Sequence, residues 1–400
     1  MKILQLCNKA PFPANDGSSI AIANLALGLA DNGIDLHVMV INTKKHFKAD
    51  EKIDVLIKEK TNYKSVYKNT NTTFFGAFIN LFSKQSYFVS RFYFKEFELE
   101  LINKLKSQTF DIIQLEGVFM ASYMPTIRAH SKAKIVIRAH NIEHQIWERL
   151  LIEEKNWFKK KYVSIQNKRL KKFELKAFNN CDAIVPITDI DNKNLKLLFP
   201  NQLVETCLTG LNLDDYKMVL HSKQPNTIFH FASMDWMPNT EAVLWLLEKV
   251  WNSVVKELPN AKLVLAGRGM PDSIKQKASN TITISEQVES SVEFYKTFDI
   301  MLVPLWSGSG LRIKLVEGLA YGKAIITTSI GAEGIPYVAN KHFIIADNAI
   351  DFKNAIVTLI KNQALKLDLQ NAARALAEAE FNYKIIAEKL IGFYKQLLKP

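Results

Sequence analysis

Short apolar runs alternate with longer stretches of helical periodicity along the whole chain. In the first half, the strand-like runs lie at residues 2–7, 34–41, 111–116, 133–140 and 181–188. In the second half, they lie at residues 227–233, 261–267, 281–285, 299–305, 324–329 and 343–347. Nearly continuous apolar strands that alternate with helices are typical of parallel sheets covered on both faces. The pattern therefore predicts an α/β fold of two doubly wound, Rossmann-like domains.

The length of 400 residues also favours two domains, because it exceeds what one hydrophobic core usually supports. We expect a first domain over residues 1–205 and a second over residues 206–380. Residues 381–400 have helical spacing, and we expect this C-terminal helix to cross back to the first domain. Because ligands bind outside the carboxyl ends of parallel strands, two such domains facing each other would enclose a cleft.

Positive charge is concentrated in the first half of the chain. Residues 1–200 contain 31 Lys or Arg against 20 Asp or Glu, whereas residues 201–400 contain 21 against 20. Hydrophobic residues make up 48% of the sequence, so the whole chain is expected to fold. The uneven charge predicts that the first domain meets an anionic partner.

Two stretches of the basic half, residues 74–95 and 155–176, combine aromatic side chains with cations. Aromatic anchors beside cations suit a surface that rests on anionic lipid headgroups, so an anionic membrane is the predicted partner. The alternative for each stretch is that its aromatics are core residues and its cations form an ordinary solvated face. No nucleic-acid recognition module is visible, so we expect no nucleic-acid partner.

The expected location is cytoplasmic, peripheral on the inner face of the cell membrane. The apolar run before Asn8 is too short for a secretory signal peptide, and no window reaches the ~18 uninterrupted apolar residues of a membrane span. Cys7, Cys181 and Cys207 are odd in number and far apart. They are expected to be reduced, buried thiols rather than reactive or metal-binding ones.

A turn of small residues follows the apolar run 299–305. This turn, Ser307-Gly308-Ser309-Gly310, matches neither the P-loop nor the dinucleotide-binding pattern, but it allows backbone N–H groups to face an anion at a helix start. Arg312 and Lys314 lie in the first turns of that helix, where cations oppose the helix dipole and need another partner. The partner is either a nucleotide diphosphate or a distant carboxylate.

Glu317 follows on the same helix, between apolar residues. A carboxylate there is costly to bury without hydrogen-bond donors, and the hydroxyl groups of a ribose would supply them.

Three blocks of the second half resemble glycosyltransferase family 4, the retaining glycosyltransferases of the GT-B fold (glycosyl transferases group 1). The blocks are SMDWMPNTEAVLWLL, LPNAKLVLAGRG and FDIMLVPLWSGSGLRIKLVEGLAYGKAIITTSIGAEGI. The resemblance covers almost the whole chain. It implies a hexosyltransferase-type enzyme that needs no metal and no cofactor and uses a UDP- or GDP-sugar as donor.

The resemblance also implies roles for individual residues. The candidate catalytic residues are His140, Arg312 and Lys314, with His140 approaching the donor sugar from the end of the run 133–140. The candidate donor-binding residues are Gly17, Ser18, Gly267, Arg268, Val288, Ser309, Gly310, Leu311 and Glu317. His140 could instead be a histidine with a purely structural hydrogen bond.

The chain departs from the family pattern in two places. Glu317 matches the second Glu of a Glu-x7-Glu pair, but the first falls at Ser309, which has no carboxylate. The Arg and Lys that many members carry after the first strand of the second domain are also absent from residues 233–239, so Arg312 and Lys314 are expected to supply that charge. Within this segment we expect Asn239 to be a helix N-cap without a catalytic role.

Two motifs suggest a metal site, but the other interpretation of each is preferred. Asp189-Ile190-Asp191 spells an Asp-x-Asp motif, yet it begins a helix, where an Asp caps the first turn. His140 and His144 are spaced as two ligands on one helical face, but nothing else in the sequence supports a metal.

The resulting hypothesis is a glycosyltransferase that moves a sugar from a nucleotide diphosphate to a lipid-linked or growing glycan. Such an acceptor belongs to the assembly of a cell-surface polysaccharide or lipopolysaccharide. Two alternatives stay open at this point: a nucleotide-sugar epimerase of the same fold, and a non-catalytic partner that only binds a sugar nucleotide.

Overall fold

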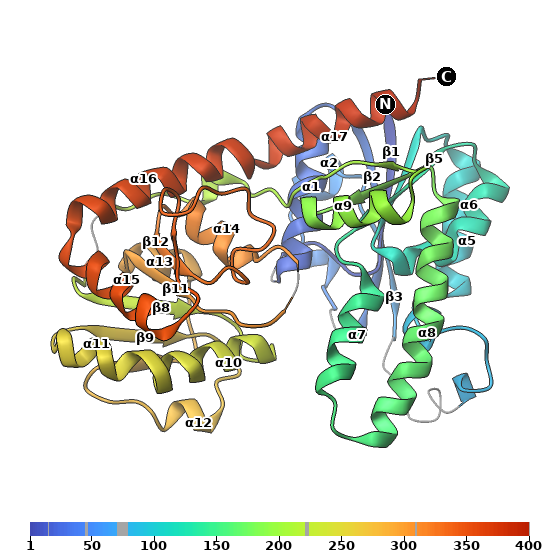
Figure 1. Ribbon diagram of the computed structural model, residues 1–400. Coiled ribbons are helices and arrows are strands. Elements are labelled where there is room, and N and C mark those ends of the chain that lie inside the picture. The colour runs from blue at the N-terminus through green and yellow to red at the C-terminus, as the bar shows by residue number, and fades with distance from the viewer. Residues whose placement is uncertain (15, 45–46, 70–78, 221–223, 309, 400) are drawn as a thin grey trace. The chain divides into compact units, whose positions relative to one another are not determined.

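The structure is a computed structural model of the 400-residue chain, and it describes all residues except 15, 45–46, 70–78, 221–223, 309 and 400 (Figure 1). Its described residues form two compact units. Unit 1 comprises Met1–Gly210 and Tyr383–Pro400, and unit 2 comprises Leu211–Asn382. Each unit contains one parallel sheet with helices on its faces, so the predicted α/β fold of two doubly wound domains is confirmed.

Unit 1 contains a seven-stranded sheet with the strand order β3-β2-β1-β4-β5-β6-β7, and every pair in it is parallel. The strands are β1 Lys2–Cys7, β2 Asp35–Thr43, β3 Lys64–Lys68, β4 Ile112–Glu116, β5 Lys134–Ala139, β6 Ala183–Pro186 and β7 Leu203–Val204. The helices are α1 Gly17–Asp31, η2 Asp50–Lys52, α2 Val55–Lys60, α4 Tyr87–Ser90, α5 Lys95–Ser107, η3 Val118–Tyr123, α6 Met124–His130, α7 Glu143–Glu153, α8 Trp157–Asn180, α9 Asp189–Leu198 and α17 Tyr383–Leu397.

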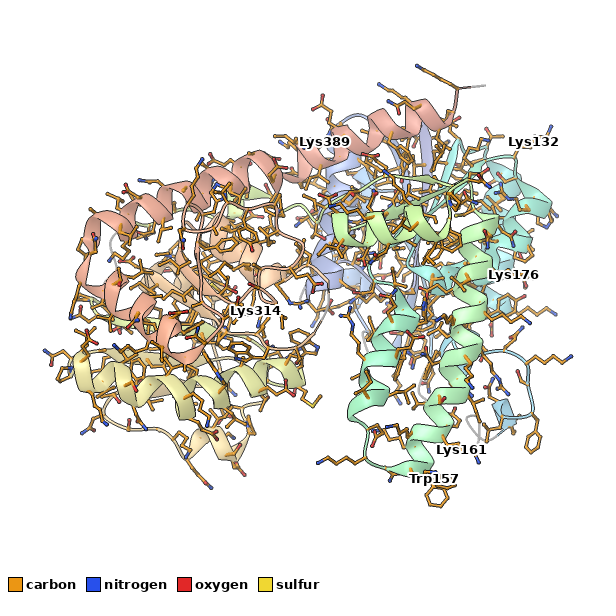
Figure 2. The ribbon with its side chains drawn as sticks, in the orientation of Figure 1. Lys132, Trp157, Lys161, Lys176, Lys314 and Lys389 are labelled. Atoms are coloured by element: carbon orange, nitrogen blue, oxygen red, sulfur yellow. The ribbon has the colours of Figure 1, made fainter. Side chains whose placement is uncertain are left out.

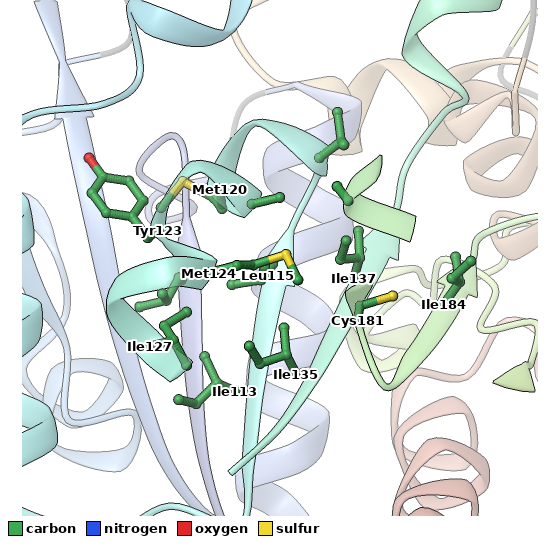
Figure 3. Packing of buried hydrophobic residues seen from close by; sticks show 14 of the residues in the cluster. Ile113, Leu115, Met120, Tyr123, Met124, Ile127, Ile135, Ile137, Cys181 and Ile184 are labelled. Carbon is green, nitrogen blue, oxygen red and sulfur yellow. The ribbon is translucent and has the colours of Figure 1, made fainter. Parts of the chain in front are cut away.

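Successive side chains of a strand point to opposite faces of the sheet, so the strands of unit 1 contribute to two different hydrophobic cores. In β1, Leu4 and Leu6 join a cluster that includes side chains of β4, β5, α5 and α6 (Figure 3). Ile3 and Cys7 of the same strand face the opposite core, which is shared with α1 and α17. Burial on both faces explains why these strands have nearly continuous apolar sequences.

The sequence pattern does not predict β3 and β7. β3 reads KSVYK, and its lysines interrupt any apolar run, because this strand lies at the edge of the sheet and is only partly buried. β7 has only two residues. The three cysteines are free and buried, as expected.

The C-terminal helix α17 is part of unit 1 and packs along α1 (Figure 1). The two helices approach closely at Gly28. A Cβ atom at position 28 would lie 2.6 Å from the carbonyl oxygen of Tyr383 and 2.9 Å from Cβ of Ala387. A glycine is therefore needed in α1 to bring the helices together.

Replacing Gly28 with alanine is expected to destabilise the protein by about 1–3 kcal/mol, because the added methyl group forces α17 away from α1. The matched control is Gly392→Ala in α17, where nothing lies within 4 Å of the added Cβ. That change is expected to stabilise the helix by about 0.5–1 kcal/mol. Calorimetric melting temperatures of both variants test the prediction. A melting temperature for Gly28→Ala equal to or above that of the wild type would contradict it.

Unit 2 contains a six-stranded parallel sheet with the order β10-β9-β8-β11-β12-β13. Its strands are β8 Thr227–Phe231, β9 Lys262–Ala266, β10 Ile282–Ser285, β11 Ile300–Val303, β12 Ala324–Thr327 and β13 Ile344–Ile345. Its helices are η4 Leu213–Asp215, α10 Met237–Trp245, the π-helix η5 Leu246–Trp251, α11 Asn252–Glu257, α12 Asp272–Lys275, α13 Ser291–Thr297, α14 Ile313–Ala320, α15 Ala349–Lys361 and α16 Gln363–Glu380.

Candidate active site

The strand order of unit 2 reverses direction between β8 and β11. In open parallel sheets, ligands bind at the carboxyl ends of the strands on either side of such a reversal. The segment 232–239 leaves β8 at this point, and the segment 304–312 leaves β11. The second segment contains the glycine turn that the sequence singles out.

Arg312 is the N-cap residue of α14, and its side chain is only 3% exposed. Its Nη1 donates a hydrogen bond of 2.6 Å to the carbonyl oxygen of Gly310, which closes the turn. Its Nη2 lies 3.7 Å from Oε2 of Glu333. Gly310 and Gly308 have positive φ angles of 79° and 105°, which residues other than glycine rarely adopt. The turn and the guanidinium group therefore form one local structure.

Trp236, which precedes α10, lies against the same turn. The guanidinium carbon of Arg312 is 5.8 Å from the centre of its ring, and Nζ of Lys314 is 5.9 Å from it. A Cβ atom at position 308 would lie 2.8 Å from the ring, so Gly308 makes room for the indole. The ring is 40% exposed. One aromatic side chain thus holds two cations beside the turn.

Lys314 is partly buried in the first turn of α14 and donates a hydrogen bond to Oδ1 of Asn239. Burial and the neighbouring Arg312 lower the pKa of Lys314 to about 7. Two cations held this close in a partly buried position repel each other, and an anion between them would relieve the repulsion. Of the two expected partners, the structure shows the carboxylate, since Oε2 of Glu333 lies 3.7 Å from Nη2 of Arg312.

Glu317 lies one turn further along α14, and its Oε1 accepts a hydrogen bond of 3.3 Å from the hydroxyl of Tyr216. Burial raises the pKa of Glu317 to about 7, and the hydrogen bond from Tyr216 offsets only part of this effect. A carboxyl group that has one donor among the described residues has capacity for further hydrogen bonds, as hydroxyl groups of a ligand would provide.

Gly267 and Arg268 follow β9 and lie beside the segment that leaves β8. Gly267 has a φ angle of 129°, and a Cβ atom there would lie 1.8 Å from the carbonyl oxygen of Ala232, so no other residue fits. The exposed Arg268 contacts Ser233 and Asp235 through Nε, each at 3.2 Å. Val288 is half-buried in the segment after β10. Leu311 is buried, and Ser309 lies outside the described residues.

The candidate His140 of unit 1 follows the carboxyl end of β5 and lies beside Glu116, the last residue of β4. Nε2 of His140 is 2.6 Å from Oε2 of Glu116, a carboxylate with no appreciable exposure. Glu116 also accepts hydrogen bonds from Gln5 and Gln114, and lies 3.4 Å from Nη1 of the buried Arg138. Burial opposes the charge of Glu116, but Arg138 and His140 lower its pKa to about 2. Burial lowers the pKa of His140, and Glu116 offsets part of this effect.

Gly17 and Ser18 begin α1, and Asp16 caps it by accepting a hydrogen bond of 2.9 Å from the backbone N–H of Ser19. Lys9 lies 2.6 Å from Asp16. Burial opposes the charge of Asp16, but the hydrogen bonds from Lys9 and Ser19 lower its pKa.

Two predictions about helix caps are wrong in detail. Asn239 lies inside α10, whose N-cap is Trp236, and its side chain bridges Lys314 and the carbonyl oxygen of Ser233. The helix that contains Asp189 is capped by Thr188, because the threonine hydroxyl accepts the N–H of Asp191 at 3.1 Å. A polar residue near a helix start does not reveal by itself which side chain turns back to the backbone.

His140 and His144 contact different carboxylates. Nδ1 of His144 lies 2.6 Å from Oε2 of Glu174, whereas His140 contacts Glu116. Across the described ranges, no three His, Cys, Asp or Glu side chains are grouped as a metal site would require. None of the described helices is long and apolar enough to cross a membrane.

Comparisons with known proteins support sugar transfer as the activity. Residues 225–362 match the family model of the glycosyl transferases group 1. A curated relative, an uncharacterized 44.6 kDa protein in the cps region of Klebsiella pneumoniae, is 26% identical over 388 residues, which cover 90% of this chain and 91% of the relative.

Two solved structures share the architecture of the whole chain. Sucrose-phosphate synthase from Thermosynechococcus elongatus matches with a TM-score of 0.71 at 14% identity, covering 99% of both chains. HepE from Anabaena, in complex with UDP, matches with a TM-score of 0.68 at 12% identity, covering 99% of this chain and 100% of HepE. The match over residues 225–362 indicates a glycosyltransferase, and the architecture shared with the two solved structures is that of the GT-B fold.

Proposed function

We propose that this glycosyltransferase belongs to family 4 and transfers a sugar with retention of configuration, without a metal ion. The donor is a sugar linked to a nucleoside diphosphate, and the acceptor is a hydroxyl group of a lipid-linked or growing glycan. The observation that carries the proposal is the pair of cations, Arg312 and Lys314, held beside the glycine turn at the strand reversal of unit 2.

The roles of the residues follow from the charge changes of the reaction. The bond between the anomeric carbon and the diphosphate oxygen breaks, a bond from the acceptor oxygen forms on the same face, and the acceptor proton passes to the departing diphosphate. The diphosphate gains negative charge in the transition state, so Arg312 and Lys314 stabilise it there. Glu317 binds ribose hydroxyls, and His140 lies against the donor sugar.

The nature of donor and acceptor has separate support. HepE has been solved with UDP and also with UDP-glucose, which makes a UDP-sugar the first donor to test, with a GDP-sugar as the alternative. The relative in a cps region supports a role in assembling a cell-surface polysaccharide, with lipopolysaccharide as the other product of this class.

A binding screen tests the proposal. Thermal shifts of the full chain are measured with UDP, GDP and ADP and with their common sugars, without added metal. We expect one nucleotide diphosphate and its sugar to stabilise the protein by several degrees. Incubation with that donor should then release the nucleotide diphosphate slowly. An isomerised sugar nucleotide without release would indicate an epimerase, and binding without any conversion would indicate a non-catalytic partner.

We also propose that unit 1 rests on the inner face of an anionic membrane through the turn between α7 and α8. At the helix ends that flank this turn, Ile152 of α7 and Trp157 and Phe158 of α8 are 79%, 61% and 78% exposed. Lys155 and residues 159–161 surround them with exposed cations, and Figure 2 shows the ring of Trp157 pointing away from the protein near Lys161. Aromatic side chains between lysines suit the headgroup layer of such a membrane.

Parts of the two basic stretches fit the other interpretation, although Ile79 and Phe82 are 53% and 83% exposed. α8 beyond the turn buries Gln166, Leu170 and Glu174 against unit 1, so its lysines form a solvated face. Phe88 stacks on Trp147 at 4.1 Å, and Val89 is buried. Residues 74–78 lie outside the described residues. Of the two stretches, 155–176 thus carries the proposed contact at its first residues, and the exposed Phe82 keeps the stretch 74–95 as a second candidate.

Changing lysines 159–161 to glutamate is expected to weaken binding to vesicles that contain phosphatidylglycerol by at least about 100-fold, at ~1 kcal/mol per lysine. The double variant Trp157→Ser/Phe158→Ser should also lose binding. The control is Leu197→Ser, which replaces an 82% exposed apolar side chain on α9. Co-sedimentation at two salt concentrations provides the measurement. Undiminished sedimentation of the lysine variant would show that the turn is not the contact.

A further inference from the structure

The end of β12 and the segment that follows it are hydrogen-bonded to the end of β11, the strand that leads into the glycine turn. Oγ1 of Thr327 donates to the carbonyl oxygen of Val303 at 2.9 Å, and Oγ1 of Thr328 donates to that of Leu305. The Thr328 hydroxyl also accepts the N–H of Gly331 at 3.0 Å. Both threonines are completely buried. These bonds fix the start of the segment against the end of β11.

Gly331 makes this fastening possible. A Cβ atom at position 331 would lie 2.2 Å from Oγ1 of Thr327 and 2.9 Å from the carbonyl oxygen of Val303. The next residue, Ala332, donates its N–H to the carbonyl oxygen of Thr328 at 2.9 Å and is buried. The backbone is therefore held firmly up to Glu333, the residue that follows.

The Glu333 side chain reaches the turn from this fixed segment. Its Oε2 lies 3.7 Å from Nη2 of Arg312, and it is 31% exposed whereas Arg312 is 3% exposed. Arg312 in turn is bonded to Gly310, so the carboxylate is positioned directly beside the turn. Part of the carboxylate faces solvent, where it can accept hydrogen bonds from a ligand.

The turn itself has hydroxyl groups but no carboxylate, since it reads Ser307-Gly308-Ser309-Gly310. A sugar nucleotide presents two kinds of group close together: phosphate oxygens, which need donors, and sugar hydroxyls, which need acceptors. Arg312 and Glu333 offer a donor and an acceptor side by side. A carboxylate is the strongest acceptor that a side chain can offer to a hydroxyl.

We propose that Glu333 accepts hydrogen bonds from hydroxyl groups of the transferred sugar and so helps to determine which sugar the enzyme uses. This inference rests on the proposed function. Arg312 then has two roles: it attracts the diphosphate, and it holds the carboxylate of Glu333 in place beside the sugar. The simpler role, in which Glu333 only balances the charge of Arg312, is the outcome that the test must distinguish.

The test compares a nucleotide with its sugar derivative. Binding of UDP and UDP-glucose, and of GDP and GDP-mannose, is measured by calorimetry for the wild type, Glu333→Gln and Glu333→Ala. For the pair that the wild type binds, we expect both variants to keep nucleotide binding within about threefold. We expect them to lose about 10- to 100-fold in affinity for the sugar nucleotide, the effect of one or two hydrogen bonds to a charged acceptor.

The matched control is Glu257→Gln. Glu257 is a partly exposed, ion-paired glutamate of unit 2, 38% exposed and 2.6 Å from Lys353. The Glu257→Gln variant should bind the nucleotide and the sugar nucleotide with the same affinities as the wild type. Equal changes for nucleotide and sugar nucleotide in the Glu333 variants would reduce Glu333 to a counter-ion of Arg312, and no change in either would exclude any role. Failure of the wild type to bind any of the four compounds would contradict the proposed function instead.

Discussion

Arg312→Ala is expected to lower the turnover number of the enzyme by about 100- to 1,000-fold, the usual cost of removing one group that stabilises developing charge. The guanidinium group is fixed by Gly310, Trp236 and Glu333 before any ligand arrives, so it needs little rearrangement to meet the diphosphate. The turnover number should fall by a larger factor than the affinity for the nucleotide, because the negative charge of the diphosphate grows in the transition state.

Release of the nucleotide diphosphate from the preferred donor, in the absence of acceptor, provides the measurement. The control is Lys353→Ala, which removes a cation of unit 2 that pairs with Glu257. Arg312 is one of the two causes that lower the pKa of Lys314, so its removal should raise that pKa and move the alkaline limb of the pH profile upward. Turnover within twofold of the wild type would show that the diphosphate binds elsewhere.

Glu116→Gln is expected to destabilise unit 1 by about 3–5 kcal/mol, because it leaves the buried guanidinium of Arg138 without its charge partner. The exposed pair of Lys64 and Glu100 provides the control, since Glu100→Gln should change stability by no more than about 1 kcal/mol. Scanning calorimetry separates the transition that the variant affects from the others. An unchanged melting profile would contradict the prediction.

The pH dependence of this effect has a definite sign. The pKa of Glu116 is about 2 in the folded state and near its ordinary value of 4.5 in the unfolded state. The group thus stabilises the fold fully above about pH 4.5, and this contribution is lost as the pH falls toward 2. The contribution of the Glu116 carboxylate to the difference in melting temperature between wild type and Glu116→Gln should shrink as the pH falls below 4.5.

The sequence predicts the strands and helices whose apolar side chains recur at regular spacing because these side chains are buried. The strands on either side of each strand reversal, such as β8 and β11, are buried on both faces, so their sequences are nearly continuous apolar runs. The edge strand β3 escapes detection because it is only partly buried and carries lysines at both ends. The glycine turn is also visible in sequence, since several small residues directly after a buried strand indicate a tight backbone turn.

The contacts between residues far apart in sequence could not be predicted. Glu116 reads as one more polar residue at a strand end, and only the sheet order brings it to His140. Trp236 and Glu333 lie in segments separated from the turn by whole helices or strands, yet both contact Arg312. A motif-based search finds residues that lie together in sequence. Glu116, Trp236 and Glu333 reach their partners only through the tertiary fold.

The position of α17 in unit 1 has a consequence for biosynthesis. The apolar face of α1 has no complete cover until residues 383–397 are made, and these follow all of unit 2 in the chain. Tyr394 of this helix also donates to Gln114, the neighbour of Glu116 in the buried polar network, at 2.5 Å. Unit 2 can therefore finish folding during translation while unit 1 waits for its last helix, and chains truncated before residue 383 should depend on chaperones to stay out of aggregates.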